Sequence, residues 1–345
     1  MFDTSATESQ IAATHPSSPP AISVNGLGKR YGELEAVRGI DFEVATGETF
    51  GFLGPNGAGK STTINMLCTL VRPTSGSATV AGHDVARERD AVRRNIGLVF
   101  QDSTLDGYLT GEQNLRLHAE LYGMPRQSIA PRMRQVLEMV GLWERRRSLV
   151  NTFSGGMKRR LEIARGLLHS PRVLFLDEPT IGLDPQTRSS IWNYISELGE
   201  AEDITIFLTT HYMEEAEYCE RIAIIDQGKI IVLDTPEALK ESVGKDRVQI
   251  HTDDDAAAIV VLRERFGIEA KISEELVTFG VPLGEEFVPR LFDEWDPAHP
   301  PIRSVSVSRP SLDDVFMSYT GSTIRDAEQS PGADHLRNVA RMMGR

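Results

Sequence analysis

The sequence predicts an α/β fold, built on a parallel sheet with helices on both faces, followed by a small α+β domain. Three observations support this. Residues 48–53 read as a strand that passes through a glycine-rich turn into a helix over residues 60–70. Strands then alternate with helices over residues 154–208, which indicates a parallel sheet. The pattern changes near residue 247, and a length of 345 residues accommodates a second, smaller domain.

The first domain is expected over residues 21–243. Alternating apolar residues at 22–24 and 40–44 predict antiparallel strands that open the domain. A strand at 96–100 leads into a mainly helical insert at about 102–165, with apolar residues at helical spacing within 111–142. The later elements are a helix at 154–169, a strand at 173–176, a helix through 192 and 198, a strand at 204–208, and a hairpin of 221–226 with 229–233.

The second domain is expected over residues 244–320 in the order β-α-β-β-α-β, a split βαβ arrangement. Its strands are predicted at 247–251, 268–272, 276–281 and 302–307, and its helices at 255–266 and 285–295. Residues 1–20 and 321–345 are polar and are expected to form loose tails, with a short basic helix possible at 335–345.

Composition excludes several classes of protein. The apolar runs, such as residues 173–176 and 222–225, are far shorter than a membrane span. The net charge of −13 disfavours nucleic acid as a partner. The start of the chain lacks the basic and apolar stretches of a secretion signal. Cys68 and Cys219, both expected in helices, are too far apart for a metal or redox motif and are interpreted as reduced, buried thiols.

A phosphate-binding loop is the most specific motif of the chain. Two glycines flank four positions and are followed by Lys and Ser, and the loop joins a predicted strand to a predicted helix. The backbone N–H groups of such a loop surround phosphate oxygens, the lysine contacts the β- and γ-phosphates, and the serine hydroxyl binds Mg²⁺. The predicted nucleotide-binding residues are Gly54, Pro55, Asn56, Gly57, Ala58, Gly59, Lys60, Ser61 and Thr62.

Two carboxylates end the apolar strand at 173–176. Asp177 is predicted to hold Mg²⁺ through water, and Glu178 to accept a proton from the water that attacks the γ-phosphate. An apolar run that ends in Asp-Glu is by itself more often a strand end with solvated charges. The phosphate-binding loop upstream reverses that preference.

Between these motifs lies Phe153-Ser154-Gly155-Gly156-Met157, and with it residues 21–243 resemble the ABC ATPase family. The segment is similar to the family signature, with Phe153 in place of the usual Leu. The resemblance implies that Ser154, Gly155 and Gly156 present a hydroxyl, backbone donors and a helix N-terminus to the γ-phosphate held by the opposite subunit. An isolated Ser-Gly-Gly would otherwise be a linker or a helix cap.

Four further residues match the family in order. Tyr31 resembles the aromatic residue that stacks on adenine, and Gln101 resembles the glutamine that meets Mg²⁺ and senses the helical insert. Asp184 resembles the loop through which the two sites communicate, and can also cap the helix that begins with Pro185. His211 resembles the histidine that contacts the γ-phosphate.

The resemblance implies ATP and Mg²⁺ as cofactors, a head-to-tail dimer of ATPase subunits, and a separate transmembrane permease that docks on the helical insert. Such a subunit lies on the cytoplasmic face of the membrane. Residues 308–316 are similar to the closing motif of drug-efflux ATPases of the daunorubicin-resistance type, which favours export of a drug or lipid-like molecule. Importer motors and permease-free ABC ATPases are the alternatives.

Local spacing makes one further prediction at this closing motif. Ser311 is expected to cap an amphipathic helix. The apolar side of that helix is predicted to consist of Leu312, Val315, Phe316 and Tyr319.

Overall fold

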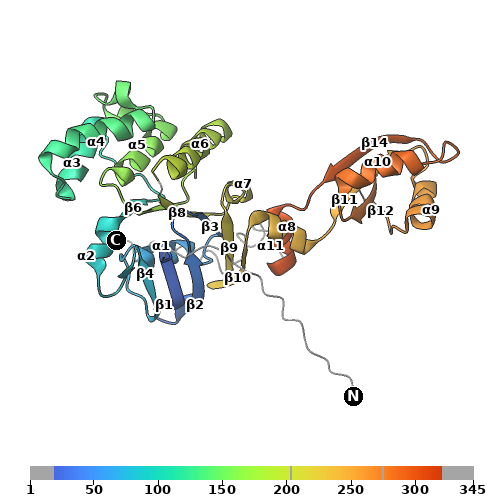
Figure 1. The fold of residues 1–345 in the computed structure, drawn as a ribbon, viewed down its shortest axis with the longest axis horizontal. Helices are drawn as coiled ribbons and strands as arrows, with labels where there is room; N and C mark the ends of the chain where they lie inside the picture. The colour runs from blue at the N-terminus through green and yellow to red at the C-terminus, as the bar shows by residue number, and fades with distance from the viewer. Residues whose placement is uncertain (1–18, 203, 274–275, 321–345) are drawn as a thin grey trace, which may run out of the picture.

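The computed structural model describes residues 19–320, apart from 203 and 274–275 (Figure 1). Our predictions for residues 1–18 and 321–345 lie outside this part of the chain. The described residues form three β-sheets and the helices that cover them. None of the helices in the described ranges is both long and apolar enough to span a bilayer.

An antiparallel sheet with strand order β2-β1-β4-β5 opens the fold, as predicted. Ile22 pairs with Val44 and Val24 with Phe42, so the alternating apolar residues share one face. The sheet also contains two strands that we did not predict, and the helix α2 follows them. The bounds are β1 (Ile22–Tyr31), β2 (Leu34–Val44), β4 (Ser75–Val80), β5 (His83–Asp84) and α2 (Arg89–Asn95).

A six-stranded sheet of order β10-β9-β3-β8-β7-β6 forms the centre of the first domain. Its strands are parallel except for β10, which pairs antiparallel with β9 across the predicted Gln227-Gly228 turn. Both turn residues have positive φ, 46° and 80°, as a tight two-residue hairpin requires. The strands are β3 (Thr49–Leu53), β6 (Ile96–Val99), β7 (Val173–Asp177), β8 (Thr205–Thr210), β9 (Arg221–Asp226) and β10 (Lys229–Asp234).

Two apolar cores lie on the two faces of this sheet. One core joins the central and antiparallel sheets around stacked phenylalanines, among them Phe42, Phe50 and Phe207, and includes helix α1 (Lys60–Leu67). The other core joins the sheet to a helical lobe, the predicted insert (Figure 1). This lobe contains α3 (Gly111–Leu121), α4 (Arg126–Met139), η1 (Trp143–Arg145), η2 (Val150–Thr152) and α5 (Gly155–Leu167), next to α6 (Pro185–Glu202).

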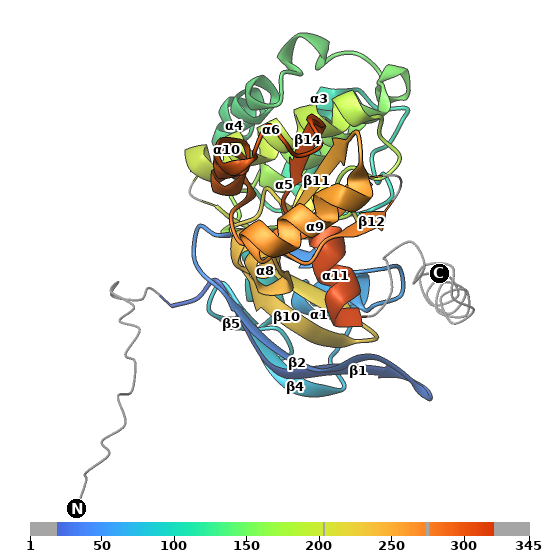
Figure 2. The same ribbon diagram turned by 90° about the vertical axis from the view of Figure 1, so that its right-hand side faces the viewer.

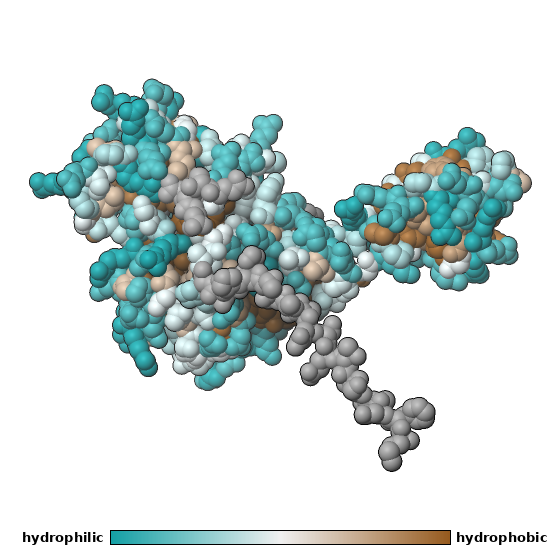
Figure 3. All heavy atoms as spheres, in the orientation of Figure 1, coloured by the Kyte–Doolittle hydropathy of each residue, from teal (hydrophilic) through white to brown (hydrophobic). Residues whose placement is uncertain are grey.

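The C-terminal domain confirms the order β-α-β-β-α-β and has a separate core. Its antiparallel sheet has the order β12-β13-β11-β14. Only β12 is shorter than predicted, because it begins at Lys271 rather than at Ile268. Figure 3 shows apolar surface on this domain. The elements are β11 (Asp246–Thr252), α9 (Asp255–Phe266), β12 (Lys271–Ser273), β13 (Leu276–Val281), α10 (Gly284–Glu294) and β14 (Ile302–Ser308).

The last described helix, α11 (Leu312–Thr320), returns to the first domain and packs against α8 (Pro236–Val243), as Figures 1 and 2 both show. Its side chains Leu312, Val315 and Phe316 belong to the core that joins the central sheet to the helical lobe, and not to that of the C-terminal domain. The last helix of the predicted C-terminal domain therefore packs on the first domain. Tyr319 is 43% exposed, so the prediction that it packs inward is wrong, although its hydroxyl lies 3.3 Å from Ser242 Oγ.

Both cysteines are buried and free. They follow the ends of α1 and of α7 (Met213–Ala216), and so lie just outside the helices in which we expected them. Burial raises the pKa of each thiol, which keeps it protonated and unreactive.

Candidate ATP-binding and hydrolysis site

The phosphate-binding loop runs from the end of β3 to the start of α1, as predicted. Gly57 and Gly59 have φ of 86° and 111°, the left-handed region that favours glycine. A Cβ on Gly54 would lie 2.2 Å from the carbonyl oxygen of Ile225, and one on Gly59 would lie 2.6 Å from that of Ala36. The backbone is therefore packed too tightly for side chains at these positions, so the fold of this loop requires glycine there.

Lys60 and Ser61 begin α1 and point to two different carboxylates. Lys60 Nζ donates to the carbonyl oxygens of Gly54 at 2.7 Å and Pro55 at 3.1 Å, and lies 3.3 Å from Glu178 Oε1. Ser61 Oγ donates to Asp177 Oδ1 at 3.2 Å. The two residues predicted to contact phosphate and metal thus meet the two residues predicted at the end of β7.

Asp177 ends β7 in a buried position. Thr209 Oγ1, on the neighbouring strand β8, donates to its Oδ1 at 2.5 Å. Burial raises the pKa of Asp177, and the hydrogen bond from Thr209 offsets only part of this effect. A buried carboxylate of this kind is stabilised by a nearby cation.

Glu178 has a φ of 45°, which is rare for a residue with a side chain and places it in the left-handed region. Its amide donates to the carbonyl oxygen of Thr209 at 3.1 Å and holds this turn against β8. Unusual backbone of this kind persists where the surroundings impose it, often at catalytic sites. The turn directs Glu178 away from Asp177 and towards Lys60.

Three predicted residues converge on the carboxylate of Glu178. Lys60 Nζ and His211 Nδ1 lie 3.3 Å and 3.2 Å from Oε1, and Gln101 Nε2 donates to Oε2 at 3.3 Å. Burial alone would raise the pKa of Glu178, but contacts with His211 and Lys60 outweigh it, and the pKa is lowered. Glu178 is therefore ionised at neutral pH, as a general base must be.

The oxygen donors fit Mg²⁺. This ion prefers a few hard oxygen ligands together with water and substrate phosphate. The Ser61 hydroxyl and the Asp177 carboxylate meet at 3.2 Å, and Gln101 contacts Glu178, the residue after Asp177. Within the described part of the chain, no group of three or more His, Cys, Asp or Glu side chains forms a self-contained metal site.

Tyr31 ends β1 beside the first turn of α1. The Thr62 side chain is its hydrogen-bonding partner, and burial raises the pKa of the phenol. The predicted adenine-stacking residue and the predicted loop residue Thr62 thus meet.

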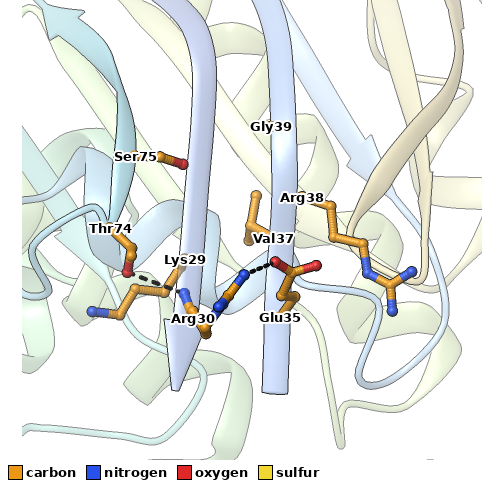
Figure 4. A pocket seen from close by; sticks show the side chains of 8 residues that line it. All are labelled: Lys29, Arg30, Glu35, Val37, Arg38, Gly39, Thr74 and Ser75. Carbon is orange, nitrogen blue, oxygen red and sulfur yellow. Dashed lines mark hydrogen bonds and ion pairs between the residues drawn. The ribbon is translucent and has the colours of Figure 1, made fainter. Parts of the chain in front are cut away.

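A separate hollow lies beside this strand end (Figure 4), and none of the predicted site residues lines it. It is lined by Lys29, Arg30, Glu35, Val37, Arg38, Gly39, Thr74 and Ser75.

The Ser-Gly-Gly segment begins helix α5. Ser154 is exposed, and its Oγ accepts from the amide of Met157 at 3.2 Å, so it is the N-cap of the helix. A Cβ on Gly156 would lie 2.4 Å from Thr187 Cγ2, so the helix start packs tightly on α6. Phe153 is buried in the core of the helical lobe, which shows that it fills an apolar position.

Asp184 is the N-cap of α6, with Pro185 as the first helical residue, as predicted. Its carboxylate accepts from the amide of Thr187 at 3.0 Å and from Thr187 Oγ1 at 2.6 Å, which lowers the pKa of Asp184. Asp184 and the Ser-Gly-Gly segment therefore lie together, since both contact Thr187 or its helix. The described contacts of residues 154–156 lie within this lobe, whereas Lys60 belongs to α1 in the other lobe (Figure 1).

Sequence reasoning missed four buried side chains beside the site, those of Thr180, Thr209, Thr210 and Glu215. Thr209 binds Asp177, while Thr180 and Thr210 donate to Glu215, Thr210 at 2.5 Å. Burial raises the pKa of Glu215, partly offset by the two threonines. Through these two bonds Glu215 ties the segment after Glu178 to the strand before His211. The two threonines that follow the apolar run 206–208 of β8 were the available signal.

The glycine loop, the Glu178 carboxylate held by lysine, histidine and glutamine, and the N-capped Ser-Gly-Gly helix are together typical of an ATPase of the ABC type. Two family models match this chain: "ABC transporter" over residues 37–181 and "ATP-binding protein DrrA1-3-like, C-terminal domain" over residues 235–320. The chain belongs to the ABC transporter ATP-binding proteins, in the DrrA-like drug-resistance subfamily.

Two relatives match almost the whole chain. The linearmycin resistance ATP-binding protein LnrL of Bacillus subtilis is 39% identical over 311 residues, 88% of this chain and 100% of LnrL. The daunorubicin/doxorubicin resistance ATP-binding protein DrrA of Streptomyces peucetius is 39% identical over 329 residues, 91% of this chain and 96% of DrrA. These matches confirm the resemblance on which our predictions rest.

Two solved structures match the first domain. CbiO1 of Clostridium perfringens, part of the ABC transporter complex cbiONQ, is 29% identical with a TM-score of 0.61, over 66% of this chain and 94% of CbiO1. The ATP-binding cassette MJ0796, in a dimeric post-hydrolysis state with ADP and Pi, is 28% identical with a TM-score of 0.56, over 62% of this chain and 98% of MJ0796. They confirm the predicted fold of the ATPase domain.

Proposed function

We propose that this chain is the motor subunit of an ATP-driven exporter, in which two copies close on two ATP molecules and move a drug or lipid-like molecule through a separate permease. The observation that carries the proposal is the convergence of Lys60, His211 and Gln101 on the ionised Glu178 beside the glycine loop. Such an arrangement suits hydrolysis of a γ-phosphate.

In the proposed reaction, Glu178 accepts a proton from a water molecule whose oxygen bonds to the γ-phosphorus. The bond between that phosphorus and the bridging oxygen of ADP breaks, which yields ADP and inorganic phosphate. Lys60 and the loop amides stabilise the negative charge on the phosphate oxygens. Mg²⁺, held by Ser61, Asp177 and Gln101, would neutralise charge on the β- and γ-phosphates. His211 contacts the Glu178 carboxylate and, in the proposed reaction, also the phosphate that is transferred.

A head-to-tail dimer is supported by where Ser154 lies. Its hydroxyl and the N-terminus of α5 are exposed, in the lobe opposite the glycine loop (Figure 1). A helix N-terminus binds anions, and here it can reach the ATP of a second copy. The dimeric state of MJ0796 with ADP and Pi supports a dimer of this chain. In such a dimer ATP belongs to the interface, and its hydrolysis favours opening.

The helical lobe offers a surface for the permease. Leu117 and Leu121, on the outer side of α3, are 49% and 75% exposed, and Tyr108 just before this helix is 88% exposed. Apolar side chains gathered on one face favour docking of another protein. The part that CbiO1 plays in a transporter complex supports a membrane partner for this chain. Attachment to a permease would place the chain on the cytoplasmic face of the membrane.

Export is favoured by the DrrA-like C-terminal domain and by relatives named for drug resistance. Copurification of the full chain in detergent from its native membranes tests the proposal. We expect a multi-span subunit to copurify and ATP hydrolysis to require that complex or to rise in it. Purification without a membrane subunit would overturn the transporter assignment, and a surface binding protein among the partners would favour import.

A further inference from the structure

Arg159 is a buried guanidinium that no part of the proposed mechanism uses. It lies five residues after Ser154 on α5, it is 6% exposed, and all five of its N–H groups have acceptors. Nε donates to the carbonyl oxygen of Pro179 at 2.5 Å. Nη1 donates to that of Phe100 at 2.5 Å and to Glu162 Oε2 at 3.1 Å.

The remaining donors reach the catalytic turn itself. Nη2 donates to the carbonyl oxygens of Asp177 at 3.2 Å and Glu178 at 3.3 Å. Three successive carbonyl oxygens, of residues 177–179, thus converge on one side chain. They converge because Glu178 has positive φ, which curls the backbone at this point. The guanidinium therefore stabilises the unusual conformation of the general base.

The same guanidinium also holds the segment that carries Gln101. Its acceptor Phe100 immediately precedes Gln101, whose amide donates to Glu178 Oε2. One side chain on the signature helix therefore fixes the backbone on both sides of the Gln101–Glu178 contact. A planar fork of five donors suits this task, whereas an ammonium group has three donors on one atom.

We propose that Arg159 is a positioning residue, which couples the placement of the Ser154 helix to the geometry of Glu178 and Gln101. This inference rests on the proposed function, because it takes Glu178 as the general base. When the tip of α5 engages the ATP of the second copy, Arg159 transmits the position of that helix to the base of its own site. Each site then hydrolyses ATP in response to engagement at the other.

The experiment uses the full chain with Arg159→Lys, which keeps a positive charge beside Glu162. We expect kcat to fall about 10²-fold, as a small displacement of a catalytic group can cause, with Kd for ATP within about threefold of the wild type. Arg160→Lys is the matched control. Arg160 lies on the same helix as Arg159, but it contacts Val140 and Tyr194 and not the catalytic turn. Its kcat should stay within about threefold of the wild type.

Two further variants separate the possible outcomes. In a Glu178→Gln background, Arg159→Lys should cause no additional loss of kcat, since it acts through Glu178. If Arg159→Lys does not fold, the neutral pair Arg159→Gln with Glu162→Gln replaces it, with the same expectation for kcat. Wild-type kcat in the folded Arg159 variant, or equal losses in the Arg159 and Arg160 variants, would overturn the inference. Normal turnover by Glu178→Gln alone would instead overturn the assigned general base.

Discussion

The ammonium of Lys60 lies 3.3 Å from the carboxylate of Glu178, and both side chains are almost completely buried. A buried pair of this kind persists because each charge compensates the other. Lys60 is the proposed phosphate-binding lysine and Glu178 the proposed general base, so this contact would link ATP binding to hydrolysis. His211 lies 3.2 Å from the same carboxylate oxygen and completes the group.

Replacement Glu178→Gln should leave ATP affinity within about threefold of the wild type and lower kcat at least about 10²-fold, because glutamine cannot accept the proton from water. ATP should then hold two copies together. Nucleotide-binding titration, steady-state hydrolysis and size-exclusion chromatography with ATP measure these effects. Normal turnover would refute the role of Glu178.

Replacement Asp177→Asn separates metal binding from folding. The pKa of Asp177 is raised by burial, so the ionised carboxylate destabilises the folded chain at neutral pH, and its folded-state stability rises as pH falls through the raised pKa. We therefore expect the metal-free variant to keep its free energy of unfolding or to gain up to about 1 kcal/mol. Thermal stabilisation by ATP with Mg²⁺ should be lost. Calorimetry with and without EDTA measures both, and a large loss of stability without metal would contradict this account.

Replacement Gly156→Ala should disrupt the Ser-Gly-Gly helix tip, since the new methyl group would lie 2.4 Å from Thr187 Cγ2. The glycine loop is in the other lobe, so ATP affinity of a monomer should change by less than about threefold while kcat falls by about 10-fold or more. Gly155→Ala is the milder comparison, because its Cβ would lie 3.2 Å from the flexible Leu183 Cδ2. Equal kcat for both variants would argue against the proposed packing.

His118 on α3 predicts a pH-dependent stability. Its partial burial, with Arg165 and His169 nearby, lowers its pKa from 6.5 to about 4. The unfolded chain takes up this proton first, so the free energy of unfolding should fall as pH drops from about 6.5 to about 4. His118→Phe, which retains an aromatic ring beside Tyr122, should reduce this fall by roughly 1 kcal/mol after allowance for its exposure. Urea titrations at several pH values test it, and an unchanged slope would count against it.

Because α11 packs on the first domain, a substitution in this C-terminal helix should destabilise the ATPase domain. Phe316→Ala empties a fully buried position in the core shared by the central sheet and the helical lobe, and should lower the free energy of unfolding of the ATPase domain by about 3–5 kcal/mol. The neighbouring Met317→Ala, at a 46% exposed position, should change it by less than about 0.5 kcal/mol. Hydrogen exchange resolved by domain would show whether the ATPase domain is the part affected.

Much of the site could be predicted because its residues follow each other at fixed short spacing along the chain. The glycine loop, Lys60 and Ser61 form one continuous segment, and Asp177 and Glu178 another, and parallel strands bring their ends to one edge of the sheet. The predicted helices and strands also agree with the structure over both domains, although β4, β5, α2, α7 and α8 were not predicted. The capping roles of Ser154, Asp184 and Ser311 could also be predicted, because each side chain binds an amide only three residues further along the chain.

The errors concern contacts between distant segments. Amphipathic spacing showed that α11 buries Leu312, Val315 and Phe316, but it does not reveal which domain receives them. Arg159 binds mainly backbone carbonyl oxygens, which leave no trace in side-chain identity. Several arginines on one helix, as on α5, are typical of an exposed basic face. Only the fold shows that Arg159 is buried.

The central claim is that the glycine loop of one copy and Ser154 of another bind the same triphosphate. The most direct measurement is the structure of the full-length Glu178→Gln protein saturated with ATP and Mg²⁺. We expect a dimer in which the Ser154 hydroxyl and the Gly156 amide lie within hydrogen-bonding distance of the γ-phosphate bound to the partner's loop. ATP bound in a lone monomer, with residues 154–156 far from any phosphate, would contradict the account.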